Sequence, residues 1–357
     1  MGGEKMIRFL LLLILPFLFI GLINKTKALI SGRKGASIFQ PYFDFIKLMK
    51  KGIVISETTS FIFPIAPSIN LACMVLAGLL LCVFHFEGDF ILFAYVLALG
   101  KFFTVIAAMD AGSSLEGMGA SREVSYTSLV EPAFFIIISS ICAIGHVYSF
   151  DSLSKMLSFN HMTWILIVIL SIVALFLMIL VEGSRTPVDD PTTHLELTMI
   201  HEVMVLDNSG VDLGFIFYAN ALKMLIFTTL IASILTPHSL WGYMVVLFII
   251  AVLIGIIESI TARLRLTHII EYTFILITLA LMVMALALLT MYETGAKGRK
   301  YDYFSNLPCA TSPSFSVAKA RRLPVAVHLL TSETDTTAKL GKAVFSSYAG
   351  VSSGGMI

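Results

Sequence analysis

Apolar residues recur along this chain in long runs that short charged segments separate. Each run is about 20 residues long, the length that an α-helix needs to cross a hydrocarbon core roughly 30 Å thick. The expected fold is therefore all-α, a polytopic membrane helix bundle. The runs predict eight spanning helices, over residues 6–24, 61–84, 90–110, 127–149, 163–182, 213–235, 239–258 and 268–291.

The composition agrees with a membrane protein. Of the 357 residues, 57% are hydrophobic and 13% are charged, whereas a soluble domain carries roughly 25% charged residues. The net charge is +1, and no basic cluster is interleaved with aromatic residues, so a nucleic-acid partner is not expected. Lys5 and Arg8 precede the first run as in a signal peptide, but no small-residue cleavage site closes it, so the run is expected to be a helix.

Lysine and arginine residues gather in the loops that follow the odd-numbered spans, as Lys25, Lys50 and Arg122 illustrate. Because loops rich in these residues stay on the cytoplasmic side, both termini are expected to face outward. The loops expected in the cytoplasm are residues 25–60, 111–126, 183–212 and 259–267.

The composition changes after residue 292. Residues 1–292 form the predicted membrane domain, whereas residues 293–357 are rich in Ser, Thr and Ala and show no amphipathic period. Such a segment buries too little apolar surface to fold by itself. It is expected to be a disordered extension, or the product of a fused or shifted reading frame.

The segment from Ser31 to Gly52 is the first with candidate chemistry. It is too short and too charged to span, and its pattern of apolar and polar residues predicts an amphipathic helix on the membrane surface. A plain surface anchor is one interpretation. The lip of a cavity is the other, favoured by polar residues beside and on this proline-initiated helix: Arg33, Lys34, Gln40 and Asp44.

The stretch from Glu182 to Asp212 is unusually acidic for a cytoplasmic loop. Apolar residues among the charges imply that parts of it enter protein or bilayer, where carboxylates and imidazoles have raised or coupled pKa values. A proton relay is predicted, with a solvated acidic loop as the alternative. The histidines are seven residues apart, which is not a zinc-binding HExxH spacing. The ionisable residues are Glu182, Asp189, Asp190, Glu196, Glu202, Asp207, Asp212, Arg185, His194 and His201.

Ionisable residues also fall inside the predicted spans. A charge at the bilayer centre costs at least about 2.5–3.5 kcal/mol. Lys101 and Lys223 lie near the middle of their spans and are therefore expected to face the bundle interior and to pair with carboxylates such as Glu131 or Glu182. At helix ends an interfacial position is an equally good explanation for three further acids, namely Asp110, Glu258 and Glu271.

The cysteines predict no metal or cofactor bound by this chain. Cys73, Cys82 and Cys142 fall in apolar runs, Cys309 lies in the tail, and no CxxC occurs. Zinc or iron–sulfur ligation needs several thiolates brought together. No phosphate-binding glycine-rich loop is present, and the GxSxG spacing at residues 350–354 lies in the tail, where no strand-to-helix turn is predicted to form a nucleophile elbow. Nucleotide, flavin and hydrolase chemistry therefore have no sequence signature here.

Two of these segments resemble a known family. The stretch GRKGASIFQPYFDFIKL, residues 32–48, resembles the segment that shapes the quinone cavity in the membrane subunit of respiratory complex I known as subunit 1. Residues 182–189 match that family's E-x-x-R-x-P-x-D, and Glu196 falls on a family carboxylate. The resemblance covers roughly residues 1–292.

The stretch from Arg185 to Glu202 looks most like one branch of that family, the membrane subunits of formate hydrogenlyase and hydrogenase-4. Thr192 and His194 stand where the quinone-reducing pattern has further acids, and the loop is about three residues longer. These departures argue against quinone binding. The quinone-site subunit of complex I is kept as the alternative, and a stand-alone ion transporter as a second one.

The resemblance implies a non-catalytic membrane anchor and ion-coupling subunit of a group 4 nickel–iron hydrogenase, in the cytoplasmic (inner) membrane of a prokaryote. Its expected partners are the hydrogenase large and small subunits, an iron–sulfur subunit and antiporter-like membrane subunits. The iron–sulfur clusters and the nickel–iron centre would lie in those partners, and protons or sodium ions would move through this chain.

Residue roles follow from the resemblance and from local physics. The family's coupling acids carry over to Glu182, Asp189 and Glu196. Arg185 is expected to hold the loop through charge-assisted hydrogen bonds to neighbouring carboxylates. The residues added from their local surroundings are Lys101, Glu131, Asp190, Glu202, Asp207 and Lys223.

Overall fold

The computed structural model describes residues 2–56, 58–145, 149–150, 162–189, 200–236, 239–262, 264 and 266–305. Residues Met1–Lys300 form one compact unit and Tyr301–Ile357 another. Within the described ranges every regular element is a helix. The helices are α1 (Gly2–Ile14), α2 (Pro16–Ile30), α3 (Gln40–Met49), α4 (Ile62–Cys82), α5 (Asp89–Asp110), α6 (Ser114–Gly145), α8 (Met162–Glu182), η3 (Glu202–Val205), α9 (Gly210–Leu235), α10 (Leu240–Ile260) and α11 (Leu266–Ser305).

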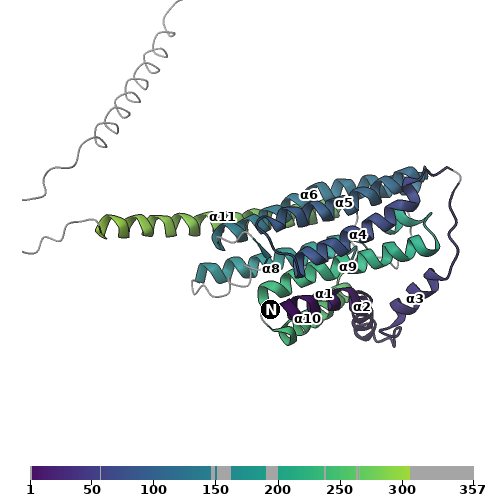
Figure 1. The fold of residues 1–357 in the computed structure, drawn as a ribbon, viewed down its shortest axis with the longest axis horizontal. Coiled ribbons are helices and arrows are strands. Elements are labelled where there is room, and N and C mark those ends of the chain that lie inside the picture. The colour runs from purple at the N-terminus through teal and green to yellow at the C-terminus, as the bar shows by residue number, and fades with distance from the viewer. Residues whose placement is uncertain are drawn as a thin grey trace, which may run out of the picture. The chain divides into compact units, whose positions relative to one another are not determined.

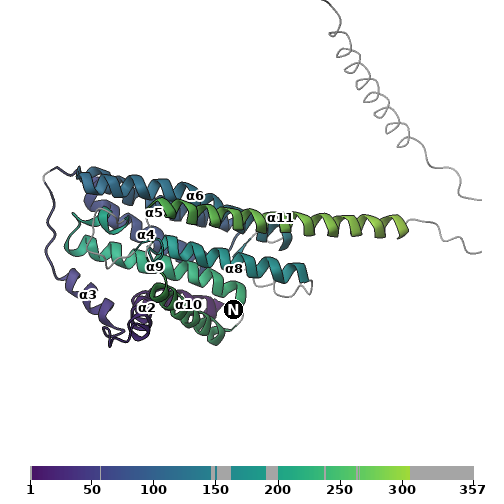
Figure 2. The ribbon, with the colours of Figure 1, turned by 180° about the vertical axis from the view of Figure 1, so that it is seen from behind.

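The described part of the chain contains seven helices that are long and apolar enough to cross a membrane. They are α4, α5, α6, α8, α9, α10 and α11, and they match the second to eighth predicted spans. Figures 1 and 2 show α4 between α5 and α9, with α6 alongside α5. The prediction of an all-α, polytopic membrane bundle is confirmed.

The first predicted span is a bent pair of helices rather than one straight helix. α1 ends at Ile14, and α2 begins at Pro16 at an angle of 57° to it. Proline lacks an N–H and its ring clashes with a preceding helical turn, but the first position of a helix tolerates both. Two tyrosines satisfy carbonyls at the end of α1, since Tyr218 donates to Leu13 at 2.7 Å and Tyr42 donates to Ile14.

Two predicted boundaries also differ from the structure. Most of residues 111–126, predicted as a loop, belongs to α6, which begins at Ser114. Polar residues and glycines interrupt the apolar residues of these first turns, so the hydrophobic pattern alone did not include them in a span. α11 continues to Ser305, beyond the predicted start of the tail at residue 293. The rest of the predicted tail lies outside the described residues.

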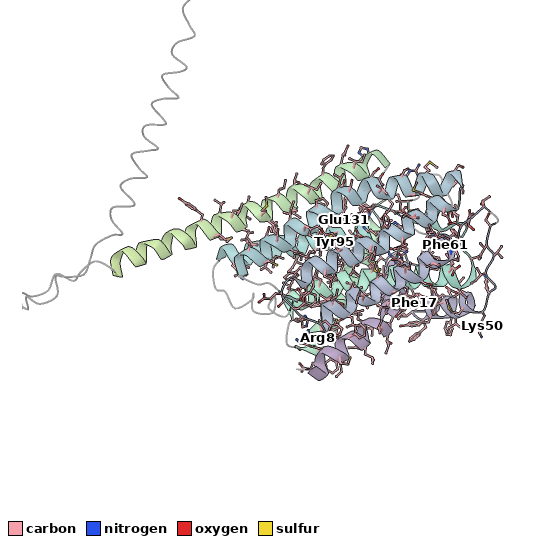
Figure 3. All side chains as sticks on the ribbon, turned by 45° about the horizontal axis from the view of Figure 1, so that its top comes forward. Arg8, Phe17, Lys50, Phe61, Tyr95 and Glu131 are labelled. Carbon is pink, nitrogen blue, oxygen red and sulfur yellow. The ribbon has the colours of Figure 1, made fainter. Side chains whose placement is uncertain are left out.

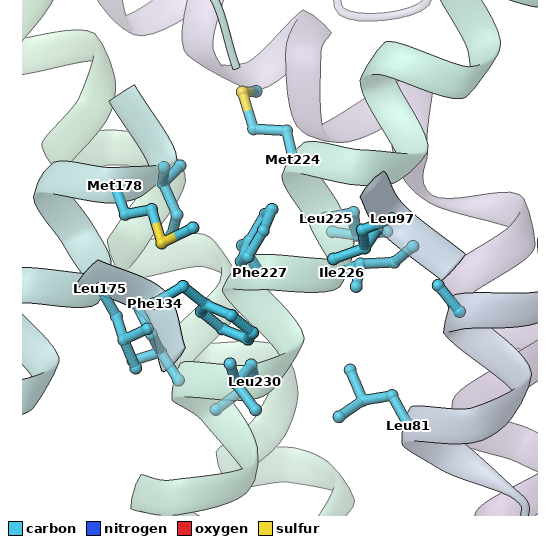
Figure 4. Packing of buried hydrophobic residues seen from close by; sticks show 14 of the residues in the cluster. Leu81, Leu97, Phe134, Leu175, Met178, Met224, Leu225, Ile226, Phe227 and Leu230 are labelled. Atoms are coloured by element: carbon cyan, nitrogen blue, oxygen red, sulfur yellow. The ribbon is translucent and has the colours of Figure 1, made fainter. Parts of the chain in front are cut away.

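α9 is the most enclosed of the seven spanning helices. It packs against α1, α2, α3, α4, α8 and α10. Figure 4 shows Phe227 of α9 between Met178 of α8 and Phe134 of α6, while Leu225 and Ile226 of α9 lie beside Leu97 of α5. Every residue from 221 to 232 is buried, so a charged residue in this part of α9 must find its partner inside the bundle.

The predicted amphipathic helix is confirmed as α3, which packs against α2 and α9 and is not among the spanning helices. Its Phe45 faces Phe17 of α2 and Tyr218 of α9, whereas Phe43 is exposed. Lys50, just after α3, lies at the same end of the bundle as Phe61, as Figure 3 shows.

α10 approaches α2 closely at Gly255. A Cβ at this position would overlap Thr26 Oγ1, so the contact depends on the missing side chain, as is common where membrane helices pack tightly. Nearly one turn further along α10, Glu258 faces Lys27 of α2 at 3.5 Å. The close approach thus brings a carboxylate and an ammonium group together inside the protein.

Candidate functional site

A cavity of about 840 Å³ lies between α2, α3, α9 and the loop that follows α8. Three of the four residues predicted for a cavity lip line it, namely Arg33, Gln40 and Asp44. Lys34, the fourth, is exposed, and its backbone carbonyl accepts a hydrogen bond from Lys25 at 2.7 Å. The structure therefore favours the cavity interpretation of this segment over a plain surface anchor.

Glu258 joins two basic residues that line this cavity. It is 6% exposed and accepts a hydrogen bond from Arg185 Nη1 at 3.3 Å, while Lys27 Nζ lies 3.5 Å from its other oxygen. Among the described residues, the carboxylate that Arg185 contacts belongs to α10. Of the two explanations for Glu258, the structure shows burial rather than an interfacial position, because Gly255 lets α10 pack tightly on α2.

Glu182 is the shared partner of two lysines inside the bundle, and this cluster is called the triad below. Lys101 Nζ donates to Glu182 Oε1, and Lys223 Nζ lies 3.3 Å from Glu182 Oε2. The three residues come from α5, α8 and α9, and Lys223 and Glu182 are buried. The predicted interior pairing of both lysines is confirmed, as expected where an unpaired charge is costly.

Glu131 reaches the triad through a small cavity. It is half-buried on α6, and it shares a cavity of about 30 Å³ with Lys101 and Glu182. On the next turn of α6, Phe135 contacts the ring of Tyr95, an exposed residue of α5. This carboxylate therefore lies between the triad and the outward face formed by α5 and α6.

Asp189 is a buried carboxylate that fixes the backbone ahead of η3. Its Oδ2 accepts the N–H groups of Ile200 at 3.0 Å and of His201 at 3.2 Å. Because a buried carboxylate bonded to backbone donors holds a loop in place, Asp189 positions His201. Asp190 and Glu196, also predicted as site residues, lie outside the described residues.

Glu202 follows His201 and lines the large cavity. Burial raises the pKa of Glu202 above its usual range, and the Asp189 carboxylate adds to this, whereas His201 and Arg185 oppose it. Glu202 is therefore a cavity-facing acid that holds its proton more tightly than a free glutamate does.

Asp207 departs from the predicted relay. Its side chain is exposed, and its backbone N–H donates to Glu116 Oε1 at 2.8 Å. Through this hydrogen bond, Asp207 holds the turn after η3 against α6. The acidic residue count of the loop alone did not distinguish this exposed carboxylate from the buried ones.

Glu123 belongs to the site, although it was not predicted from the sequence. It is 8% exposed, and its Oε2 lies 3.2 Å from His201 Nδ1. η3 reaches it because Gly119 has no side chain, and a Cβ there would lie 3.1 Å from the carbonyl of Ile200. The spacing along the sequence could have indicated Glu123, because residues 123, 127 and 131 share one face of a helix and Glu131 was already a candidate.

The described residues contain no group of three or more His, Cys, Asp or Glu side chains that could hold a metal ion. The chemistry they present is that of charged pairs within hydrogen-bond distance beside a large cavity. Carboxylates, amines and an imidazole in such contact can exchange protons, since each of them gains or loses a proton without breaking a covalent bond of the chain.

Fold and site together define a multi-pass membrane protein with a row of buried ionisable groups at the edge of a cavity. A sequence profile of the NADH dehydrogenase family matches residues 4–289. The chain belongs to this family, which confirms the resemblance to complex I subunit 1, and it is a membrane subunit of a respiratory-type complex.

Two named relatives are also, by their names, subunits of larger complexes. The chain is 28% identical to hydrogenase-4 component C of Escherichia coli (strain K12) over 235 residues, which is 64% of this chain and 73% of that protein. It is 24% identical to formate hydrogenlyase subunit 4 of the same organism over 283 residues, 73% of this chain and 90% of that protein.

A solved structure shares the fold. One chain of the membrane-bound sulfane sulfur reductase, an archaeal respiratory membrane complex, matches with a TM-score of 0.65 and 18% sequence identity. The match covers 80% of this chain and 99% of that chain. At this identity the likeness shows the fold alone.

Proposed function

We propose that this chain is the membrane anchor and ion-coupling subunit of a group 4 nickel–iron hydrogenase or formate hydrogenlyase complex. The triad of Lys101, Glu182 and Lys223, buried beside the cavity, is the observation that carries the proposal. The names of the two relatives support the hydrogenase branch. The partner subunits supply the iron–sulfur clusters and the nickel–iron centre, and the coupled ion is a proton or a sodium ion.

In this proposal, electron transfer in the docked subunits changes the charge at the cavity side of the chain. An added negative charge raises the proton affinity of nearby carboxylates, and Glu202 is such a carboxylate at the cavity wall. The triad then redistributes protons between amines and a carboxylate that already lie in contact. Glu131 offers the next acceptor, toward the α5–α6 face where an antiporter-like subunit would bind.

Replacing Glu182 tests the coupling role. In the intact complex, Glu182→Gln should lower ion-coupled hydrogen turnover at least tenfold, because glutamine cannot carry a proton between the lysines. Hydrogenase activity with an artificial electron donor, measured in the membrane fraction, shows whether the complex assembles. The matched control is Glu271→Gln, since Glu271 is exposed and pairs with His268 at 3.0 Å. Full hydrogen production with an unchanged ion gradient in Glu182→Gln contradicts the proposal.

The quinone-site subunit of complex I is the second candidate, and the cavity of about 840 Å³ favours it. Apolar side chains such as Phe17, Phe45 and Phe217 line this cavity, and ligand pockets of roughly 300–1,000 Å³ hold molecules of quinone size. The neighbouring genes separate the two candidates. Genes for a nickel–iron large subunit and its maturation protease support the hydrogenase function, and a full complex I operon supports the quinone site.

A further inference from the structure

His201 stands where the large cavity meets the buried ion pairs. It lines the cavity of about 840 Å³, a small cavity beside Glu182, and another of about 20 Å³ beside Lys101 and Lys223. Among the described residues it is the one common to these three linings. A cavity of about 20 Å³ has room for roughly one water molecule. The imidazole therefore separates the cavity from the protein interior.

A continuous series of hydrogen-bond contacts runs inward from this imidazole. His201 Nδ1 lies 3.2 Å from Glu123 Oε2, and Thr127 Oγ1 donates to Glu123 Oε1 at 3.2 Å. Lys101 Nζ donates to Thr127 Oγ1 at 3.4 Å and also to Glu182. Thr127 thus joins a carboxylate to the triad with one hydroxyl, which acts as donor on one side and acceptor on the other.

We propose that His201, Glu123 and Thr127 form the proton entry from the large cavity to the triad. This inference rests on the proposed ion-coupling function and names the route that serves it. A histidine suits the boundary because its two ring nitrogens can face different sides, and because it changes charge within the physiological pH range. The Thr127 hydroxyl suits the interior because it can pass on a proton while the side chain stays neutral.

Each transfer in this route moves one proton and no electron. The protonated imidazole gives its Nδ1 proton to Glu123, which becomes a neutral carboxylic acid. Glu123 then passes a proton to Thr127 Oγ1 while the hydroxyl turns its own proton toward Lys101. Lys101 accepts that proton after giving its previous one to Glu182, so the triad returns to its starting charge when Glu182 releases a proton onward.

The charges around His201 come from every element packed against it. The backbone of His201 is held by Asp189, so the ring has a fixed place among them. The titratable and charged groups that share a cavity lining with it are Arg33, Asp44, Lys27, Lys101, Glu123, Tyr126, Glu182, Arg185, Asp189, Glu202 and Lys223.

The test uses the intact complex in membranes and reads the number of ions moved for each hydrogen molecule formed. Thr127→Val keeps the shape of the side chain and removes the hydroxyl, whereas Thr127→Ser keeps the hydroxyl. The matched control is Thr228→Val, because the buried Thr228 hydroxyl donates to the carbonyl of Met224 in its own helix at 2.8 Å. His201→Gln retains a polar side chain that cannot take up a proton near neutral pH.

We expect Thr127→Val and His201→Gln to lower the ion yield at least tenfold, while Thr127→Ser and Thr228→Val stay within twofold of the parent. His201→Gln should also flatten the dependence of coupled turnover on pH between about 5 and 8, an effect that a structural role would not produce. If the complex with Thr127→Val does not assemble, the ion yields of Thr127→Ala and His201→Gln test the same route.

Two results overturn the inference, and they are distinguishable. If Glu182→Gln uncouples the complex while Thr127→Val behaves like Thr228→Val and His201→Gln keeps its ion yield, the entry route is wrong and the proposed function stands. If Glu182→Gln itself remains fully coupled, the proposed function fails, and the entry route fails with it.

Discussion

Glu182→Gln should destabilise the protein more than the loss of either lysine partner does. The carboxylate is 5% exposed and contacts both Lys101 and Lys223. Its removal leaves the buried ammonium group of Lys223 and the half-buried one of Lys101 without their shared counter-charge. Lys223→Met, by contrast, leaves Glu182 its hydrogen bond from Lys101, so this variant should lose less stability.

The size of the effect follows from the geometry. At the 3.3 Å that separates Lys223 Nζ from Glu182 Oε2, two unit charges attract by about 5 kcal/mol at an effective dielectric constant of about 20. Breaking a buried ion pair by removing one partner costs roughly 3–5 kcal/mol. The expected fall in the unfolding midpoint is roughly 6–15 °C, at about 2–3 °C per kcal/mol.

The buried cysteines provide the assay. Cys73 and Cys82 are 6% exposed in α4, so a thiol-reactive fluorescent dye labels them only as the bundle opens on heating. Cys142→Ser and Cys309→Ser in every variant restrict the signal to these two thiols, because Cys142 is half-buried and would react in the folded state. Melting curves are recorded in one detergent for the parent, Glu182→Gln, Lys223→Met and the double variant.

The double variant makes the test decisive. Removing Lys223 from Glu182→Gln takes away one of the two unpaired cations, so the double variant should be more stable than the additive expectation by roughly 1–3 kcal/mol. If the two single losses are equal and simply add in the double variant, Lys223 and Glu182 do not interact, and the account of the triad is refuted.

Two further predictions concern the surroundings of the site. Gly255→Ala should force α10 away from Thr26 on α2 and destabilise the chain by roughly 1–3 kcal/mol; a midpoint within 1 °C of the parent in the same dye assay would show that the helices do not touch there. Glu202→Gln should gain stability over the parent as pH rises, since the folded state raises the pKa of Glu202. Below the unfolded pKa both states are protonated and the variant gains nothing; above the folded pKa the parent bears the full cost of a buried charge. Melting midpoints of the variant and the parent, followed by tryptophan fluorescence across pH, check this prediction. A stability gain of the variant at low pH rather than at high pH would contradict it.

The spanning helices were predictable because insertion into a bilayer depends on local hydrophobicity. α8 and α10 begin and end within two residues of their predicted spans. The bend at Pro16 was missed because apolar residues continue on both sides of it, although proline itself signals a break. The extended start of α6 was missed because its first turns are polar, and packing of η3 against Gly119 holds them in place.

The residues of the site could be predicted from the sequence more fully than the contacts between them. Lys101 and Lys223 had to find interior partners, because a buried lone charge is too costly. Their common partner Glu182 could be named as a candidate but not selected over Glu131, since either carboxylate satisfies the same requirement. Only the packing of α5, α8 and α9 brought Glu182 within hydrogen-bond distance of both lysines.

A membrane bundle with a surface helix and buried charges can be predicted from local patterns, because these properties depend on the period and polarity of residues near one another in the chain. Which charges meet depends on the packing of helices that are far apart in the chain. Glu123 and His201 are 78 residues apart, and Lys27 and Glu258 are 231 apart. Such contacts depend on how close two helices approach, which the glycines and the bend between α1 and α2 set in three dimensions.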